Sequence, residues 1–311
     1  MLRYSIVEFI CSFTSETILP LYSGNIFRGA LGKSLRNICC PLKRVSCQEC
    51  LLFSGCVYAF LFESKVIKQK NRSPNLPLPF ILEPPFSGKE RYAPLEDFRF
   101  SIILIEGGIR WLSYIIYSVI EMGKVGIGLN RKEGGGRFEV KRVIKDKRVV
   151  YEDSSQGIMV LPEEHGSLKI EDIAPPTPPM ERIRVDFLTP YRVKFRNSLI
   201  TDFDFSVLIR ACLRRISSLE ATYCGGEPSL DYRGLIARSR EVEIVEEQKR
   251  WMEIRRFSFR QRSSMRLGGL VGHAIYRGEL LPFYPLLKYC EIVHVGKQTT
   301  FGFGKIRVWV P

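Results

Sequence analysis

The residues best suited to chemistry lie at the end of the chain, in the stretch HVGKQTTFGFGKIRVWV from His294 to Val310. Its glycines lack a Cβ, so their backbone can turn at positive φ and bring N–H groups close to an anion. Two lysines add positive charge beside those donors. The pattern predicts phosphate binding by Gly296, Lys297, Gly302, Gly304 and Lys305, with His294 as a candidate for proton transfer.

Two well-known phosphate loops do not fit this stretch. A Walker loop places Ser or Thr after its lysine and then begins a helix, whereas Lys305 is followed by Ile306 and an expected strand. A dinucleotide-binding fingerprint runs from a strand into a helix, and here an expected helix comes before the glycines. The remaining alternative to a phosphate site is a flexible hairpin near the C-terminus.

Positive charge is concentrated in the second half of the chain. The 311 residues carry a net charge of +14, of which +10 lies from Arg182 onward. A dense run between Lys249 and Arg277 includes two phenylalanines, Phe257 and Phe259, among its arginines. Arginine binds phosphate in a bidentate manner and aromatic rings can stack on bases, so the run predicts RNA or DNA contact rather than a merely solvated surface. The candidate phosphate ligands here are Arg255, Arg256, Arg260 and Arg262.

Cysteines near the N-terminus have the composition of a metal site. Cys40, Cys47, Cys50 and Cys56 follow the pattern C-x6-C-x2-C-x5-C, and Cys39 is an alternative first ligand. Four thiolates in a tetrahedron suit zinc and leave no open position for catalysis. The sequence therefore predicts a structural zinc and no cofactor for catalysis, and the alternative is a group of buried reduced thiols.

The order of expected elements is the same in both halves of the chain: strand, helix, two strands, helix, glycine-rich turn, strand. The two turns are 168 positions apart, at Gly136 and Gly304. This order is typical of the ferredoxin-like βαββαβ unit. We therefore expect an α+β protein with tandem ferredoxin-like domains at residues 1–173 and 182–311, the first carrying the cysteine cluster as an insertion at 39–56.

No stretch of the sequence reads as an export signal or a membrane span. The apolar run from Phe100 to Ile120 is interrupted by Glu106, two glycines and Arg110. We expect a cytoplasmic protein without a membrane partner, and a reducing compartment disfavours a disulfide framework for the cysteines.

Several of these stretches together resemble one family, the CRISPR precursor-RNA processing endoribonucleases of the RAMP superfamily, in the variety with an N-terminal cysteine cluster. The resemblance covers most of the chain. Its segments are FRGALGKSLR at 27–36, CVYAFLFE at 56–63, FILEPP at 80–85, FSFRQRSSMRLGGLVGHAIYRGEL at 257–280 and HVGKQTTFGFGKIRV at 294–308.

The resemblance implies tandem ferredoxin-like domains and binding of CRISPR repeat RNA. It implies metal-independent cleavage in which the RNA 2′-hydroxyl attacks the adjacent phosphate, and delivery of the guide RNA to effector-complex subunits in antiviral defence. Such enzymes often place a catalytic histidine near the first helix, and this sequence has none before His165. Some relatives use lysine, tyrosine and arginine instead, for which Lys33, Tyr22 and Arg28 are the equivalents by position.

Two other functions remain open at this point. The missing N-terminal histidine also fits a RAMP subunit that binds guide RNA without cutting it. From another class, a zinc-stabilised DNA-binding regulator would account for the cysteines and the charge, although no recognition-helix pattern is present.

Overall fold

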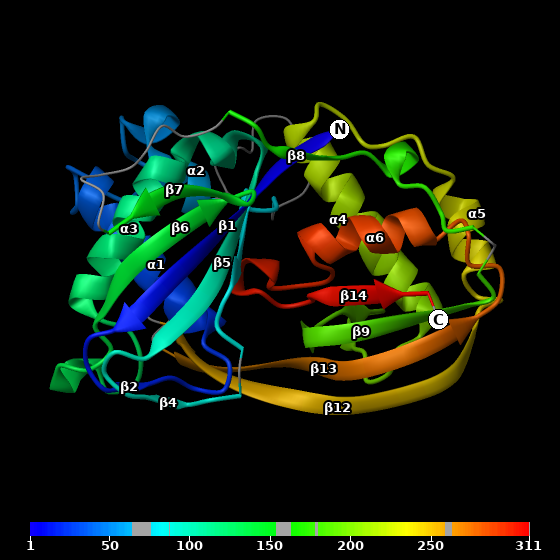
Figure 1. Cartoon of the computed structure of the whole chain (residues 1–311). Helices are drawn as coiled ribbons and strands as arrows, with labels where there is room; N and C mark the ends of the chain where they lie inside the picture. The colour runs from blue at the N-terminus through cyan, green and yellow to red at the C-terminus, as the bar shows by residue number, and fades with distance from the viewer. Residues whose placement is uncertain (64–75, 87, 154–162, 178–179, 259–262, 311) are drawn as a thin grey trace. The chain divides into compact units, whose positions relative to one another are not determined.

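The structure is a computed structural model that describes residues 1–63, 76–86, 88–153, 163–177, 180–258 and 263–310 (Figure 1). It divides into two compact units, Arg3–Ser167 and Leu168–Pro311, the second of which also includes Met1–Leu2. The division thus falls a few residues before the proline-rich stretch 174–180. None of the described helices is long and apolar enough to cross a membrane.

The N-terminal domain is an antiparallel sheet covered by two helices. Its elements are β1 (Leu2–Phe13), α1 (Gly24–Cys39), β3 (Phe80–Glu83), β5 (Asp97–Ile105), α3 (Leu112–Val125) and β6 (Phe138–Lys145). The strand order is β3-β5-β1-β6, the order of a ferredoxin-like sheet, and β7 (Arg148–Glu152) extends it beyond β6. Short β2 (Thr17–Ile18) and β4 (Arg91–Tyr92) pair separately.

The core of this domain follows from the alternation of side chains along β1. Val7, Phe9 and Cys11 point to one face and are fully buried. Phe9 lies opposite Phe100 of β5, and the two rings stack with centroids 4.8 Å apart. The helices close over that face, and the Ser34 hydroxyl of α1 donates to the Ser118 carbonyl of α3 at 2.8 Å.

The C-terminal domain repeats the arrangement. Its elements are β9 (Arg182–Tyr191), α4 (Phe205–Tyr223), β12 (Glu243–Ser258), β13 (Ser263–Arg277), α6 (Tyr284–Val293) and β14 (Ile306–Trp309). The sheet order is β12-β13-β9-β14. Helix α4 begins after Asp204, whose carboxylate accepts from the Val207 N–H at 2.8 Å. The expected α+β fold with tandem ferredoxin-like domains is therefore confirmed.

Several short elements were not expected from the sequence. They are α2 (Val57–Phe62), the hairpin of β10 (Lys194–Phe195) with β11 (Ser198–Leu199), α5 (Tyr232–Arg238) and β8 (Gly166–Leu168), which pairs with β1. All are seven residues or shorter, so none displays enough turns or alternations to produce a recognisable period.

The glycine turns of the two domains have the same geometry. The Val295 N–H donates to the Gly304 carbonyl at 2.9 Å, and the Ile127 N–H donates to the Gly136 carbonyl at 2.8 Å. The two glycines have φ of 71° and 77°. A Cβ on Gly304 would stand 1.7 Å from the Val295 oxygen, and one on Gly136 would stand 1.6 Å from the Ile127 oxygen. Both glycines are therefore required by the fold itself.

Substituting Gly304 by alanine should destabilise the protein by about 3 kcal/mol or more, because both the positive φ and the overlap with backbone oppose a Cβ. Urea unfolding measures the change. Gly29→Ala is the matched control, since a Cβ at Gly29 in α1 meets nothing within 4 Å. That change should raise stability by up to about 1 kcal/mol. Equal unfolding midpoints for Gly304→Ala and the parent protein would contradict this reading of the turn.

Candidate nucleic-acid interface

The glycine loop joins α6 to β14, and its backbone N–H groups donate hydrogen bonds to other groups of the same domain. The Gly302 N–H donates to the Thr299 carbonyl at 2.8 Å, and the Gly304 N–H donates to the Pro190 carbonyl at 3.0 Å. The Lys305 N–H donates to the Thr189 hydroxyl at 2.9 Å, and that hydroxyl donates to the Gly302 carbonyl at 2.7 Å. These N–H groups hold the loop together, which removes the reason for assigning phosphate to the backbone of Gly302 and Gly304.

His294 lies inside the domain instead of at its surface. Its exposed fraction is 0% and its φ is 58°. The ring nitrogen Nδ1 lies 3.0 Å from the Phe303 carbonyl oxygen. A carbonyl only accepts, so Nδ1 is the protonated nitrogen in this contact. A phosphodiester cannot reach the imidazole in this conformation, and His294 joins the two ends of the glycine loop. This weighs against the expected role in proton transfer.

The expected role of Lys297 is better supported. Its side chain is exposed, and its backbone N–H donates to the Arg192 carbonyl at 2.8 Å. Partial burial lowers the pKa of Lys297, and the neighbouring charges of Lys194, Arg214 and Arg192 lower it further. Four cations thus gather where the glycine loop begins. Their mutual repulsion favours an anionic partner.

The matching loop in the N-terminal domain has no lysine at the position of Lys297, although Arg131 and Lys132 follow two residues later. Its backbone geometry is the same, since the Leu129 N–H donates to the Ile18 carbonyl at 2.8 Å. Leu129 stands in the place of Lys297 and is 64% exposed. The glycines are therefore shared by both domains for structural reasons, whereas the lysine at position 297 has no counterpart at Leu129.

The long hairpin of β12 and β13 carries the arginines that the sequence predicts as phosphate ligands. Arg255 and Arg256 lie in β12, opposite Arg266 and Met265 of β13. Their side chains, together with Arg260 and Arg262, lie outside the described residues.

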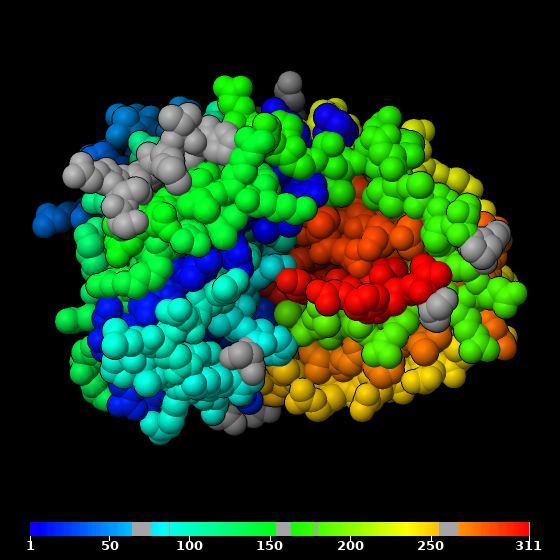
Figure 2. Space-filling model, in the orientation of Figure 1, coloured from blue at the N-terminus to red at the C-terminus, as the bar shows by residue number. Residues whose placement is uncertain are grey.

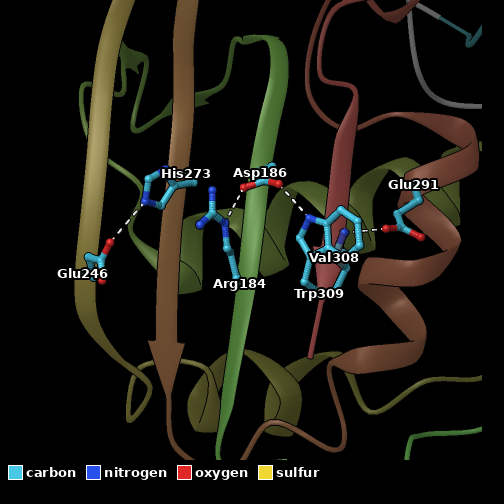
Figure 3. Close-up of polar contacts among 7 residues, drawn as sticks. All are labelled: Arg184, Asp186, Glu246, His273, Glu291, Val308 and Trp309. Atoms are coloured by element: carbon cyan, nitrogen blue, oxygen red, sulfur yellow. Dashed lines mark hydrogen bonds and ion pairs between the residues drawn. The ribbon is translucent and has the colours of Figure 1, made fainter. Parts of the chain in front are cut away.

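Polar side chains on the C-terminal sheet are largely paired with one another (Figure 3). His273 of β13 lies 3.4 Å from the Glu246 carboxylate of β12. Asp186 of β9 accepts from Arg184 Nε and from Trp309 Nε1, both at 2.7 Å. Trp309 itself is 48% exposed, and Figure 2 shows the atoms of β14 open on the surface. The only other histidine among the described residues, His165, is exposed and bonds just the adjacent Gly166 carbonyl.

The N-terminal candidates differ in accessibility. Lys33 is exposed on α1, one turn after the exposed Gly29. Arg28 lies over the Phe62 ring, with its guanidinium carbon 5.3 Å from the ring centroid. Tyr22 is 2% exposed, and burial followed by the charge of Glu83 raises the pKa of its hydroxyl well above the ordinary value. Of the three, Lys33 is exposed, Arg28 is half-buried and Tyr22 is buried.

The cysteine cluster lies between α1 and α2. Cys39 ends α1 and Cys56 caps α2, and their thiols interact electrostatically. Burial, with the charge of Cys56 as the next cause, raises the pKa of Cys39 to about 11. Cys47 interacts electrostatically with Cys56 and Cys40. Among the described residues no group of three or more donors already has the arrangement of a metal site.

Two parts of the chain match models of known protein families. Residues 2–164 match a family model described as an N-terminal domain, and residues 185–306 match the model of the CRISPR-associated endoribonuclease Cas6. An uncharacterised protein of Archaeoglobus fulgidus is 27% identical over 295 residues, which cover 93% of this chain and 92% of the relative.

Solved structures share the fold. Thermus thermophilus Cas6 matches with a TM-score of 0.56 at 14% identity, covering 99% of both chains. A Cas6 product complex matches with a TM-score of 0.55 at 16% identity, also over 99% of both chains. A partial Cas6-RT-Cas1–Cas2 complex matches with a TM-score of 0.59 at 15% identity, over all of this chain and 46% of the other. The C-terminal domain thus matches the Cas6 family of CRISPR-associated endoribonucleases over residues 185–306, and the chain as a whole shares the fold of solved Cas6 structures.

Proposed function

We propose that this protein cleaves CRISPR repeat RNA, in the cytoplasm, to produce guide RNAs. The 2′-hydroxyl of the nucleotide before the cut gives its proton to solvent as its oxygen attacks the adjacent phosphorus, and the bond from phosphorus to the 5′-oxygen breaks as that oxygen takes up a proton. The products are a 2′,3′-cyclic phosphate and a free 5′-hydroxyl. No metal ion is needed for this reaction, because the nucleophile belongs to the RNA and cationic side chains can stabilise the charge that develops on phosphate.

The observation that carries the proposal is the gathering of Arg192, Lys194, Arg214 and Lys297 at the start of the glycine loop. Within a Cas6-family domain, such a group provides fixed positive charge for an RNA backbone. The test is incubation with repeat RNA, followed by mapping of the cut and analysis of the product ends. A single cut with a cyclic phosphate supports the proposal, and intact RNA at saturating protein contradicts it.

Lys33 is the group we assign to proton transfer. Its exposed ammonium on α1 can give a proton to the departing 5′-oxygen, which is the step that a positioned acid accelerates. Tyr22 is less suitable because it is buried and holds its proton strongly. Lys297 and its neighbours bind phosphates of the RNA backbone.

The proposed partners are repeat RNA and other CRISPR proteins. A product complex and a Cas6-RT-Cas1–Cas2 assembly exist for proteins of this fold. They support the proposal that this chain also delivers its product within a larger CRISPR complex.

A second candidate function is an RNA-binding Cas6-type subunit that does not cut. The burial of His294 favours it, since that removes one accessible imidazole from the described residues. The same cleavage assay separates the two functions: tight binding of repeat RNA without any cut would identify the binding subunit.

We also propose that the cysteine cluster holds a structural zinc. The segment 41–56 has no buried residue, and it exposes Leu51 by 95% and Leu52 by 52%. A segment of this length without a core of its own needs another source of stability, and thiolates suit zinc. Cys47, Cys50 and Cys56 would be ligands, with Cys40 or Cys39 as the fourth.

Protein purified without an affinity tag should contain about one zinc per chain. Cys47→Ser should lower the zinc content severalfold and make 41–56 more sensitive to protease, because the metal would join this segment to α1 and α2. Elemental analysis and limited proteolysis measure both effects. Cys224→Ser, at a half-buried cysteine outside the cluster, is the control and should retain its zinc. Less than about a tenth of a zinc per chain in the parent protein would refute the site.

A further inference from the structure

A cavity in the C-terminal domain has no role in the function described so far. It has a volume of about 350 Å³ and lies between α4, the segment 193–195 and the region around α5. Its charged lining consists of Lys194, Arg210, Arg214 and one acid, Glu227. Its volume falls in the range of small-ligand sites, which begins at about 300 Å³.

Arg210 is held in this cavity without a full set of partners. Its guanidinium carbon is 5.6 Å from the centroid of the Phe195 ring, and that of Arg196 is 5.3 Å from the same ring. The Nε atom of Arg210 is buried and has no hydrogen-bond acceptor among the described residues. A buried donor on a charged group that lacks an acceptor costs free energy. Arg210 as a whole is half-buried, so its terminal N–H groups remain for an anion in the cavity, while Nε leaves the guanidinium short of one partner among the described residues.

The rest of the lining suits a base better than an ion alone. Two aromatic residues, Phe195 and Tyr232, contribute to the wall, and Val193, Val207 and Ile236 supply apolar surface. Ser217 adds a hydroxyl. A phosphate ion would use the cations and leave the apolar part empty. A nucleotide satisfies both, with its phosphate on the guanidinium groups and its base on the apolar and aromatic side.

Positive charge continues from the cavity to the glycine loop. Lys194 and Arg214 line the cavity, and both act on the charge of Lys297 at the start of the loop, as does Arg192. A free nucleotide would need only the cavity. A chain of phosphates would use the whole row of cations, with one nucleotide turned into the cavity and its neighbours along the loop.

We infer that this cavity is a nucleotide-binding subsite for single-stranded substrate RNA, in which Arg210 and Arg214 hold a phosphate and the apolar wall receives the base. The inference rests on the proposed function, since it assigns a segment of the same RNA to this domain. A free nucleoside 5′-monophosphate has the same chemistry, and the experiment separates the two sources.

The test uses three variants of the full chain, each checked for its melting temperature. Ser217→Trp fills the cavity and leaves every charge in place. The double substitution Arg210→Ala, Arg214→Ala removes the cations and leaves the space. Arg238→Ala, an exposed cation on α5 that does not line the cavity, is the control. Affinity for repeat RNA is measured over a range of salt concentrations, with 4-thiouridine placed at successive positions for crosslinking.

Ser217→Trp should weaken RNA binding about tenfold with little change in salt dependence, because it blocks a base rather than a phosphate. The double arginine variant should flatten the log–log salt slope by about 0.7 for each phosphate that the protein no longer neutralises. One thiouridine position should crosslink to Phe195 or Tyr232. Arg238→Ala should bind like the parent protein.

Parent-like affinity in both cavity variants overturns the subsite. If adenosine or uridine 5′-monophosphate binds the parent and not Ser217→Trp while RNA affinity is unchanged, the cavity serves a free nucleotide and the assignment to RNA is wrong. Cleavage at saturating RNA is measured separately. If the parent protein never cuts RNA but the cavity variants bind it more weakly, the subsite stands and the endonuclease proposal is wrong. If the parent protein cuts RNA and the cavity variants bind it with unaltered affinity, the endonuclease proposal stands and the subsite is wrong.

Discussion

Repeat RNA with a 2′-deoxy nucleotide directly before the cut should remain intact over a time in which the all-ribose RNA is cut to completion. The proposed nucleophile is that 2′-hydroxyl, so its removal deletes the reacting atom instead of weakening a contact. RNA affinity should change little, because one hydroxyl contributes far less than the phosphates bound by the cations around Lys297. Gel analysis of the cut and filter binding of the same RNA measure both effects.

A deoxy substitution two nucleotides away from the cut is the control and should be processed at the normal rate. Brief addition of EDTA should leave the rate unchanged, whereas prolonged chelation also tests the stability of the cysteine segment. If the deoxy substrate is cut and leaves a 3′-hydroxyl end, water is the nucleophile and the proposed reaction is wrong.

The fold could be predicted from the sequence because its elements are long enough to show a period. Strand β1 alternates buried and less buried side chains from Ser5 to Cys11, and α4 maintains one apolar face over nineteen residues. The repeated glycine turn could also be predicted. In both domains the backbone has a positive φ and a carbonyl oxygen lies where a Cβ would be, so only glycine fits. Short elements such as α5 left no such pattern.

The site was harder to predict because burial and proximity are properties of the folded chain. A histidine beside a lysine in a glycine-rich stretch reads as an accessible acid or base, and nothing in its neighbours shows that His294 points inward to the Phe303 carbonyl. The cavity around Arg210 is formed by segments some forty residues apart in sequence. The apolar spacing of α4 indicates its buried face only, and in the sequence Arg210 and Arg214 are indistinguishable from ordinary solvent-exposed charges on a helix.

Lys33→Ala should lower the cleavage rate, whereas His294→Ala should lower the stability of the fold. Loss of the Lys33 ammonium should lower the cleavage rate at saturating RNA by about 10²–10⁴-fold, the usual contribution of a positioned proton donor. Its melting temperature should stay unchanged, because Lys33 is exposed on α1. His294→Ala should destabilise the protein by about 1–3 kcal/mol, since the Phe303 carbonyl loses a buried donor. The molecules that remain folded should cut at nearly the parent rate.

Single-turnover cleavage with excess protein, together with urea unfolding, separates the two effects. Lys124→Ala is the matched control for Lys33, because Lys124 is also an exposed lysine on a helix of the N-terminal domain and pairs with Glu121 at 2.7 Å. It should leave the rate unchanged. A normal rate in Lys33→Ala would pass proton transfer to Tyr22. His294→Ala could instead lower the rate by about 10²–10⁴-fold at unchanged stability. That result would show that the loop opens during the reaction and exposes the imidazole, and His294 would again be the acid or base.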